Sequence, residues 1–353
     1  MPSAATSPPT SDQNRVDART DSRSESDWEG VRLHVVTGKG GTGKTTVAGA
    51  LALALAQNGR RVLVMEVEGR QGLAQIFDTT PLPYAERHVA VAPGGGEVWA
   101  LAVDPEEALL EYLEIFYKMR RAGSALRRMG AIEFATTIAP GVRDVLLTGK
   151  AMEATKRTRD GRPVYDAVIL DAPPTGRITR FLNVNTEVAG LAKVGPIKSH
   201  ADRVMALIKS PRTAVHIVSV LEEMPVQETV DGVAELTSAG IPVGAIIINM
   251  DRVAHLSATQ QRAAIKGSLP RDTITKSLEV VGLGSKRTTV AQIVDELCTE
   301  AHGHAVRLQL ETTERQVLQK LEHPTYTLPL LTEGADLSGL YELAQALSEQ
   351  GAA

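Results

Sequence analysis

The chain has 353 residues, and its 38 basic and 42 acidic side chains give a formal net charge of −4, which argues against a broadly basic face for nucleic acid. No apolar run in the sequence reaches the roughly 18 residues of a membrane span. The single cysteine, Cys298, excludes an intrachain disulfide framework and a metal site built from several cysteines of one chain.

Residues 1–29 are predicted to form a disordered tail. The segment is rich in Ser, Pro, Thr and alternating charges, and it holds almost no large apolar side chain before Trp28. Such a composition buries too little surface to offset the entropy of ordering. It also lacks the apolar stretch of a secretory signal. The ordered domain is therefore expected to span residues 30–353.

From Val31 onward the pattern alternates between short apolar runs and helical periodicity. A strand is predicted over residues 31–37, followed by a glycine-rich turn, a helix over 44–57 and a second strand over 61–65. Later apolar runs lie at 99–103, 167–170, 214–220 and 244–248. This alternation predicts an α/β fold with a mainly parallel sheet flanked by helices. Helical insertions are expected at about 104–160, 186–212 and 251–322, where they would form a helical subdomain.

The turn after the first strand carries the strongest motif, GKGGTGKT, which fits G-x-x-x-x-G-K-[ST]. Glycines in such a loop let backbone N–H groups point at phosphate oxygens, and the following helix adds the attraction of its N-terminal dipole. Lys44 is expected to reach the β- and γ-phosphates, Thr45 to bind Mg²⁺ and Thr46 to lie near the α-phosphate. The predicted nucleotide-binding loop comprises Gly38, Lys39, Gly40, Gly41, Thr42, Gly43, Lys44, Thr45 and Thr46.

The same glycines also match the G-x-G-x-x-G fingerprint of dinucleotide-binding proteins, with Glu66 or Glu68 as a ribose-binding acid. Two features argue against that alternative. A dinucleotide has no γ-phosphate or metal ion for Lys44 and Thr45 to bind. In addition, Asp171 follows the apolar run 167–170 and has the form of a Walker B acid, which holds Mg²⁺ through water. The predicted cofactors are ATP and Mg²⁺.

Lys39 follows the first glycine of the loop, where its side chain is badly placed to reach phosphates in its own site. This placement resembles the deviant Walker A ATPases, the class that includes MinD, ParA, the nitrogenase iron protein and ArsA. In that class the lysine crosses a dimer interface and acts in the partner's site. The resemblance implies either a homodimer or a heterodimer with a paralogous ATPase.

Two further segments are similar to the switch regions of the ArsA arsenite-pump ATPases and of the tail-anchored-protein targeting ATPases of the GET pathway. They are MEVEGRQGLAQIF at residues 65–77 and DAPPTGRITRFL at residues 171–182. The resemblance extends from about Val31 to Leu347 and looks closest to actinobacterial single-loop members named anion-transporting ATPases. It implies an ATP-hydrolysing molecular switch whose remaining site residues are Pro174, Thr175 and Gly176 in switch II, Asn249 against adenine, and Pro329 and Leu330 beside the adenine pocket.

The sequence departs from that family at Glu68, where the family has an aspartate that positions the attacking water. The extra methylene shifts the carboxylate by about an ångström, and such a misplacement can lower a rate on the order of 100-fold. Switch I is altered further at Gly69, Arg70 and Gln71, and switch II at Pro173 and Arg177. We therefore expect ATP hydrolysis that is slow or dependent on a partner, with Lys39, Lys44, Glu68 and Asp171 as the catalytic set.

Three hypotheses follow. The first is a dimeric ATP-driven switch that moves an unidentified protein client, and a single cysteine excludes the cysteine-based arsenite chemistry of a pump subunit. The second is a weakly hydrolysing regulatory subunit of a paralogous heterodimer, and the third is a ParA- or MinD-like positioning ATPase. Residues 340–353 contain Glu342 and Glu349 but no Lys or Arg, which disfavours a membrane-binding terminal helix. A cytoplasmic protein that binds no nucleic acid is expected, with peripheral membrane association through a partner left open.

Overall fold

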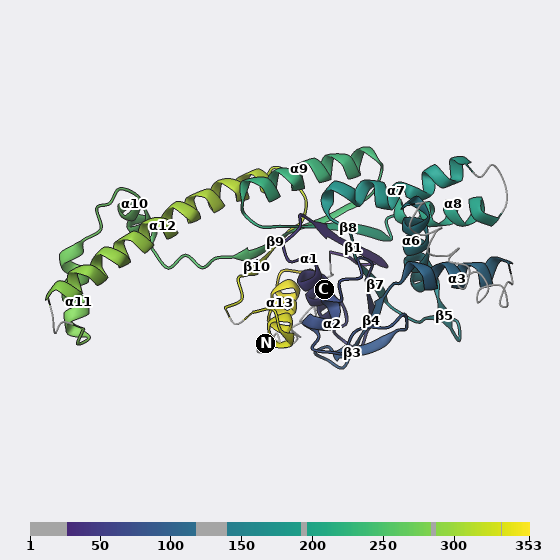
Figure 1. Ribbon diagram of the computed structural model, residues 1–353, viewed down its shortest axis with the longest axis horizontal. Helices are drawn as coiled ribbons and strands as arrows, with labels where there is room; N and C mark the ends of the chain where they lie inside the picture. Colours follow the sequence, from purple (N-terminus) through teal and green to yellow (C-terminus); the bar gives the residue numbers. More distant parts are fainter. Residues whose placement is uncertain (1–26, 118–139, 192–195, 284–286, 333) are drawn as a thin grey trace, which may run out of the picture.

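The computed structural model describes residues 27–117, 140–191, 196–283, 287–332 and 334–353 (Figure 1). Predictions for residues 1–26, and for the part of the first helical insertion at 118–139, lie outside these ranges. In the described part, the main sheet has eight strands in the order β10-β9-β8-β1-β7-β2-β4-β3. Within this sheet, only β3 and β4 pair in antiparallel fashion. The predicted α/β fold with a mainly parallel sheet is thus confirmed.

The central strands are buried on both faces, as parallel strands covered by helices are expected to be. Their register places Val36 of β1 and Glu66 of β2 directly beside Asp171 of β7. The carboxyl ends of these three strands therefore meet at one edge of the sheet. The strand bounds are β1 Leu33–Gly38, β2 Arg61–Glu66, β3 Arg87–Val91, β4 Glu97–Ala102, β7 Ala167–Asp171, β8 Thr213–Ser219, β9 Val243–Asp251 and β10 Thr325–Pro329.

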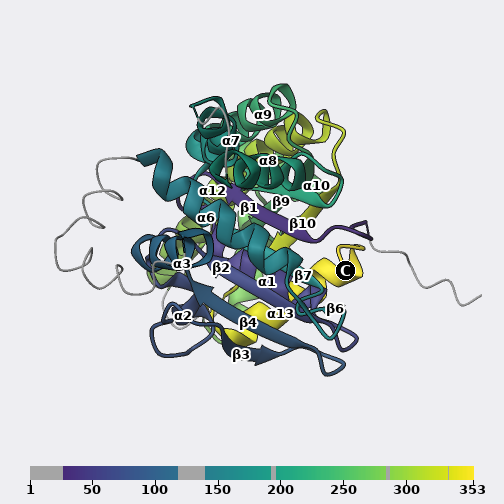
Figure 2. The same ribbon diagram turned by 90° about the vertical axis from the view of Figure 1, so that its right-hand side faces the viewer.

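One face of the sheet is covered by α1 (Lys44–Leu55), α2 (Gly72–Ile76) and α13 (Leu337–Glu349). Every residue of α1 from Val47 to Leu55 is buried. A helix that is apolar all round must be covered on all sides, and α1 lies between the sheet and α13 (Figure 2). The C-terminal helix is therefore part of the core that supports the phosphate loop.

The other face is covered by a second helical layer, which holds its own apolar cluster around Leu147, Ile178 and Phe181. In the described residues, the predicted insertions at about 104–160 and 186–212 belong to this layer and are mainly helical. The helices are α3 Pro105–Tyr117, α6 Pro140–Lys156, α7 Thr175–Leu191, α8 Pro196–Ile208 and α9 Glu223–Ser238, and a short hairpin joins β5 Thr158–Arg159 to β6 Arg162–Pro163.

The third insertion forms an arm of α10 (Ala258–Ile265), α11 (Arg271–Val280) and α12 (Arg287–Gln319). The 33 residues of α12 give a length of about 50 Å at 1.5 Å per residue. Figure 1 shows that α12 leads away from the sheet and carries α10 and α11 at its far end. Two ion pairs tie the base of α12 to the end of β9: Arg315 Nη2 with Asp251 Oδ1 and Arg252 Nη1 with Glu311 Oε1, both at 2.6 Å.

The ordered body begins before residue 30. The backbone N–H of Asp27 donates to Gly351 O (3.1 Å), and the hydroxyl of Tyr326 donates to Asp27 Oδ2 (2.5 Å). The Trp28 ring stands edge-on to His216 with centroids 4.8 Å apart. Residues 27–29, which the composition assigned to the tail, therefore pack against the domain. Their partners lie nearly 200 residues or more away in sequence, where local composition gives no sign of them.

Candidate nucleotide site

The phosphate loop joins the end of β1 to the start of α1, and two of its glycines are required by close approach. A Cβ added at Gly38 would lie 2.2 Å from the carbonyl oxygen of Val218, and one added at Gly43 would lie 2.4 Å from Asn249 Nδ2. Gly43 also has a φ of 84°, in the left-handed region that favours glycine. The motif is therefore a packed loop, set by β8 and β9 on one side.

The loop leaves backbone donors available to a ligand. The N–H of Thr42 bonds to Lys39 O (3.3 Å), and the N–H of Val47 bonds to Gly43 O (2.9 Å). In the described part of the chain, the N–H groups of Gly40, Gly41 and Gly43 have no acceptor. Free donors at the N-terminus of a buried helix form an anion-binding cradle. The donor set therefore fits the phosphates of a nucleotide.

Lys44 lies against this loop, where its Nζ donates to Lys39 O (3.4 Å). Burial lowers the pKa of Lys44, whereas the neighbouring carboxylates of Asp171 and Glu68 raise it. The Lys44 side chain therefore lies beside the free N–H donors, with two carboxylates close by. Thr46 is in the first turn of α1, partly buried next to Thr45.

The two residues predicted to hold Mg²⁺ contact each other directly. The Thr45 hydroxyl donates to Asp171 Oδ2 at 2.7 Å. Burial raises the pKa of Asp171 to about 6, against the opposing effect of the Thr45 hydrogen bond. No group of three or more His, Cys, Asp or Glu side chains suited to a metal occurs among the described residues. Mg²⁺ takes few protein ligands beside substrate phosphates and water, so this hydroxyl–carboxylate pair fits it.

Glu66 is a buried carboxylate of this site. The sequence analysis named it only as an alternative to Glu68. It lies beside Asp171 in the sheet register, and its Oε2 accepts from the N–H of Leu73 at the start of α2 (3.0 Å). Its Oε1 is buried without a hydrogen-bond partner in the described structure. The position at a strand end was visible in the sequence, but the burial was not.

Glu68 is brought to the same edge, since its charge acts on the pKa of both Lys44 and Asp171. Its Oε2 lies 3.7 Å from Arg70 Nε, and its side chain is 22% exposed. The carboxylate is therefore within the site and accessible. Its role in positioning water stays a prediction.

Lys39 has a partner within its own chain. Its Nζ donates to Glu228 Oε1 on α9, and Thr175 at the start of α7 donates to Glu228 Oε2 at 3.0 Å. The hydrogen bond from Lys39 is the main cause that lowers the pKa of Glu228. Pro174 and Gly176 flank Thr175, and Thr37 Oγ1 bonds to Pro173 O (2.7 Å), so switch II is fastened to the end of β1. No motif in the sequence pointed to Glu228.

The residues expected near adenine lie at the carboxyl ends of two neighbouring strands, β9 and β10. Asn249 is buried and donates from Nδ2 to Thr42 O (2.9 Å), so in this structure one of its amide hydrogens is used by the phosphate loop. Pro329 is paired with Asp251 at the ends of β10 and β9, and the N–H of Leu330 donates to Asp251 O (2.9 Å). A hollow of about 250 Å³ adjoins the loop, lined among others by Gly40, Met224 and Met250.

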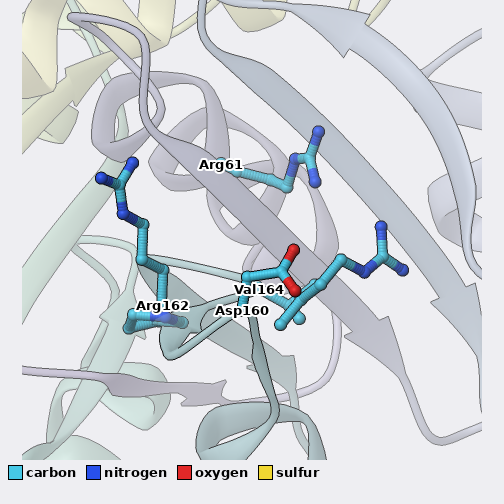
Figure 3. A pocket seen from close by; sticks show the side chains of 6 residues that line it. Arg61, Asp160, Arg162 and Val164 are labelled. Carbon is cyan, nitrogen blue, oxygen red and sulfur yellow. The ribbon is translucent and has the colours of Figure 1, made fainter.

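A different hollow lies at the opposite ends of the strands. It is lined by Arg61 at the start of β2 and by the hairpin residues Arg159, Asp160 and Arg162 (Figure 3). Arg61 is already bound to Glu97 (2.7 Å) and stacks over Trp99. This hollow is separate from the nucleotide site.

A glycine-rich loop at the start of a buried helix, a threonine bonded to a strand-end aspartate, and a parallel sheet beneath them define a P-loop ATPase. Residues 31–210, slightly more than half of the chain, match the family described as Anion-transporting ATPase. The chain therefore belongs to the ArsA ATPase family. None of the described helices has the length and apolarity needed to cross a membrane.

Relatives support this assignment over nearly the whole chain. ATPase BagA from Mycobacterium tuberculosis is 49% identical over 323 residues, which cover 91% of this chain and 94% of that protein. An arsenical pump-driving ATPase from Acidiphilium multivorum is 27% identical over 237 residues, covering 60% and 38%. ATPase get3 from Schizosaccharomyces japonicus is 29% identical over 165 residues, covering 46% and 47%.

Proposed function

We propose that the chain is a Mg-ATP-driven switch that works as a dimer in the cytoplasm, either with a second copy or with a paralogous ATPase. The phosphates bind to the N–H groups of the loop and to Lys44. Mg²⁺ is held by Thr45 and, through water, by Asp171, and Glu68 orients the attacking water. The observation that carries this proposal is the free phosphate cradle beside the partly buried Thr45–Asp171 pair.

In this proposal Lys39 changes partners. Its ammonium bonds to Glu228 in the single chain, and Glu228 also holds Thr175 of switch II. When two chains close over nucleotide, Lys39 leaves Glu228 and neutralises phosphate charge in the partner's site. Exchange of this contact then couples dimer closure to α7 and α9, and so to the helical layer that would present a client surface.

The test is steady-state ATP turnover with Mg²⁺ over a wide range of protein concentration. A dimeric site predicts specific activity that rises with concentration, and Lys39→Ala abolishes turnover while leaving ATP binding measurable by equilibrium dialysis. Lys209→Ala, an exposed lysine outside the site, serves as the control and leaves turnover unchanged. Specific activity that is constant down to the lowest concentration, with an active Lys39→Ala variant, would rule out the dimeric mechanism.

A second candidate function is that of a regulatory subunit that binds ATP and hydrolyses it weakly. The contact between Glu68 and Arg70 favours it, since a carboxylate drawn towards a guanidinium is less available to orient water. In this case the purified chain binds ATP with negligible turnover at every concentration, and activity appears on mixing with a paralogue. Arg70→Ala would then raise the turnover of the chain alone.

A further inference from the structure

Three helices of the second layer, together with Tyr84, line a partly open cavity of about 340 Å³ away from the nucleotide site. Ala108 of α3 and Leu146 and Met152 of α6 line its inner part, and each is at most 8% exposed. Tyr112 of α3 contacts the ring of His200 on α8, with centroids 5.5 Å apart. The interior of the cavity is therefore apolar and its walls are aromatic, as in sites that bind small organic ligands.

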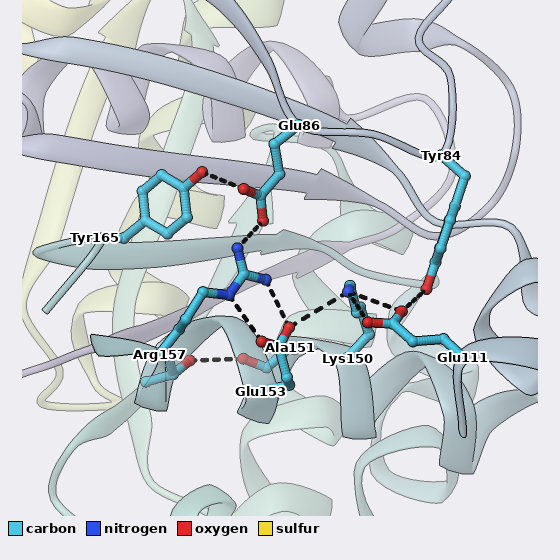
Figure 4. A network of polar contacts seen from close by, with 9 residues as sticks. Tyr84, Glu86, Glu111, Lys150, Ala151, Glu153, Arg157 and Tyr165 are labelled. Carbon is cyan, nitrogen blue, oxygen red and sulfur yellow. Dashed lines mark hydrogen bonds and ion pairs between the residues drawn. The ribbon is translucent and has the colours of Figure 1, made fainter. Parts of the chain in front are cut away.

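The acidic groups on the wall are already bound to cations. Lys150 Nζ bonds to Glu111 Oε1 (2.8 Å), and Arg157 Nη2 bonds to Glu153 Oε2 (2.6 Å). Figure 4 shows that these pairs form one network, which Tyr84, Glu86 and Tyr165 complete. The wall thus offers neither spare negative charge nor free cations at Lys150 and Arg157.

Two further cations line the opening. Lys156 at the end of α6 and Arg203 on α8 are exposed, and among the described residues neither forms an ion pair. The pKa of His200 is lowered mainly by burial and further by the positive charges of Arg203 and Lys156. Both cations therefore act on the same part of the cavity. The opening is therefore positive, and the space behind it is apolar.

We propose that this cavity binds a medium-chain carboxylate, with its hydrocarbon chain among Ala108, Leu146 and Met152 and its carboxylate between Lys156 and Arg203. A volume of about 340 Å³ holds roughly ten groups of about 30 Å³, the share of one water molecule. An acyl chain of about ten carbons fills that space. The fork of the Arg203 guanidinium suits a planar carboxylate.

Calorimetric titration of the full chain without nucleotide tests the proposal. Decanoate binds saturably at one site per chain, about tenfold tighter than decanol, and decylammonium does not bind. Octanoate binds roughly 15-fold more weakly than decanoate, since each buried methylene contributes about fourfold. Equal affinity for decanoate and decanol overturns the proposal, as does the absence of saturable decanoate binding.

Surface variants locate the site without disturbing the fold. Replacement of both Lys156→Gln and Arg203→Gln weakens decanoate binding about tenfold, to the level of decanol, and leaves decanol unchanged. Lys209→Gln, an exposed lysine next to the end of α8 and outside the lining, leaves both affinities as they were.

The methyl NMR signal of Met152, assigned with Met152→Leu, shifts on titration. A decanoate affinity unaffected by the double substitution, or an unmoved Met152 signal, places the ligand elsewhere and contradicts the assignment. Because no nucleotide is present, the result is independent of the ATPase switch.

Discussion

His34 of β1 and His216 of β8 share a buried hydrogen bond that fixes the tautomer of both rings. The N–H of Ala245 donates to His216 Nδ1 (3.1 Å), so His216 carries its proton on Nε2 and donates to His34 Nδ1 (3.0 Å). His34 then carries its own proton on Nε2, which has no acceptor in the described structure. Burial lowers the pKa of His216 to about 3 and that of His34 well below its usual range. Both rings are neutral in the folded protein.

This pair predicts a loss of stability in mild acid. Histidines with a depressed folded pKa stabilise the fold above their unfolded pKa of about 6.5, and this contribution is lost as the pH falls below that value. For two histidines, the free energy of unfolding should decrease by roughly 3–4 kcal/mol between pH 6.5 and pH 5. Urea unfolding at a series of pH values measures it. His34→Leu should remove about half of the slope, and a slope unchanged by this substitution would contradict the assignment.

Asp171 illustrates a site residue that lowers the stability of the nucleotide-free chain. Its folded pKa of about 6 lies above the ordinary value of 3.8, so its unfavourable effect grows as the pH rises between these values. Asp171→Asn should therefore raise the free energy of unfolding at pH 7 by up to roughly 3 kcal/mol and reduce Mg-dependent ATP turnover at least 100-fold. Denaturant unfolding and turnover measure the two effects. Asp160→Asn, in an exposed turn, should change neither the free energy of unfolding nor the turnover. If Asp171→Asn lowered the free energy of unfolding instead, Asp171 would not be a destabilising buried charge.

At the scale of elements, the phosphate loop could be predicted from the sequence, whereas the contact that α9 makes through Glu228 could not. The glycine spacing of the loop is local, and the strand before it and the helix after it were both evident from periodicity. The position of Glu228 depends instead on the way in which α9 packs through Val226, Val233 and Leu236. That packing brings Glu228 to Lys39, which is 189 residues away in the chain. A contact set by tertiary packing leaves no spacing rule in the sequence.

This contact predicts that Glu228→Gln makes Lys39 available to a partner chain. The two side chains are about one-third exposed, and an ion pair of this kind contributes about 0.2–1 kcal/mol. The protein concentration for half-maximal ATP turnover should therefore fall by up to about fivefold. Glu223→Gln, an exposed acid in the first turn of the same helix, is the matched control. A higher half-maximal concentration for Glu228→Gln would instead indicate that Glu228 supports the closed dimer.

At the scale of the whole molecule, the sheet and the helical character of the insertions could be predicted, but the directions of the insertions could not. Alternating strands and helices leave the chain few topologies, since parallel crossovers have one hand. The segment 251–322 showed only helical periodicity, and the ion pairs at the base of α12 join residues that are 59 and 64 positions apart in the chain. The cavity lined by α3, α6 and α8 likewise depends on the packing of three separate helices.

Residues 27 and 28 pack against β8, β10 and the segment after α13. Trp28 packs between His216 of β8 and Tyr326 of β10, and Asp27 bonds to both Tyr326 and Gly351. Trp28→Ala should lower the free energy of unfolding by about 2 kcal/mol, less than the 3–5 kcal/mol of a fully buried tryptophan because the ring is only partly buried. ATP turnover should be unaffected, since none of these contacts involves a residue of the phosphate loop, Glu68 or Asp171. Glu29→Ala, an exposed neighbour, should leave stability unchanged. If denaturant unfolding shows that Trp28→Ala is as stable as the unsubstituted chain, the Trp28 ring does not stabilise the sheet.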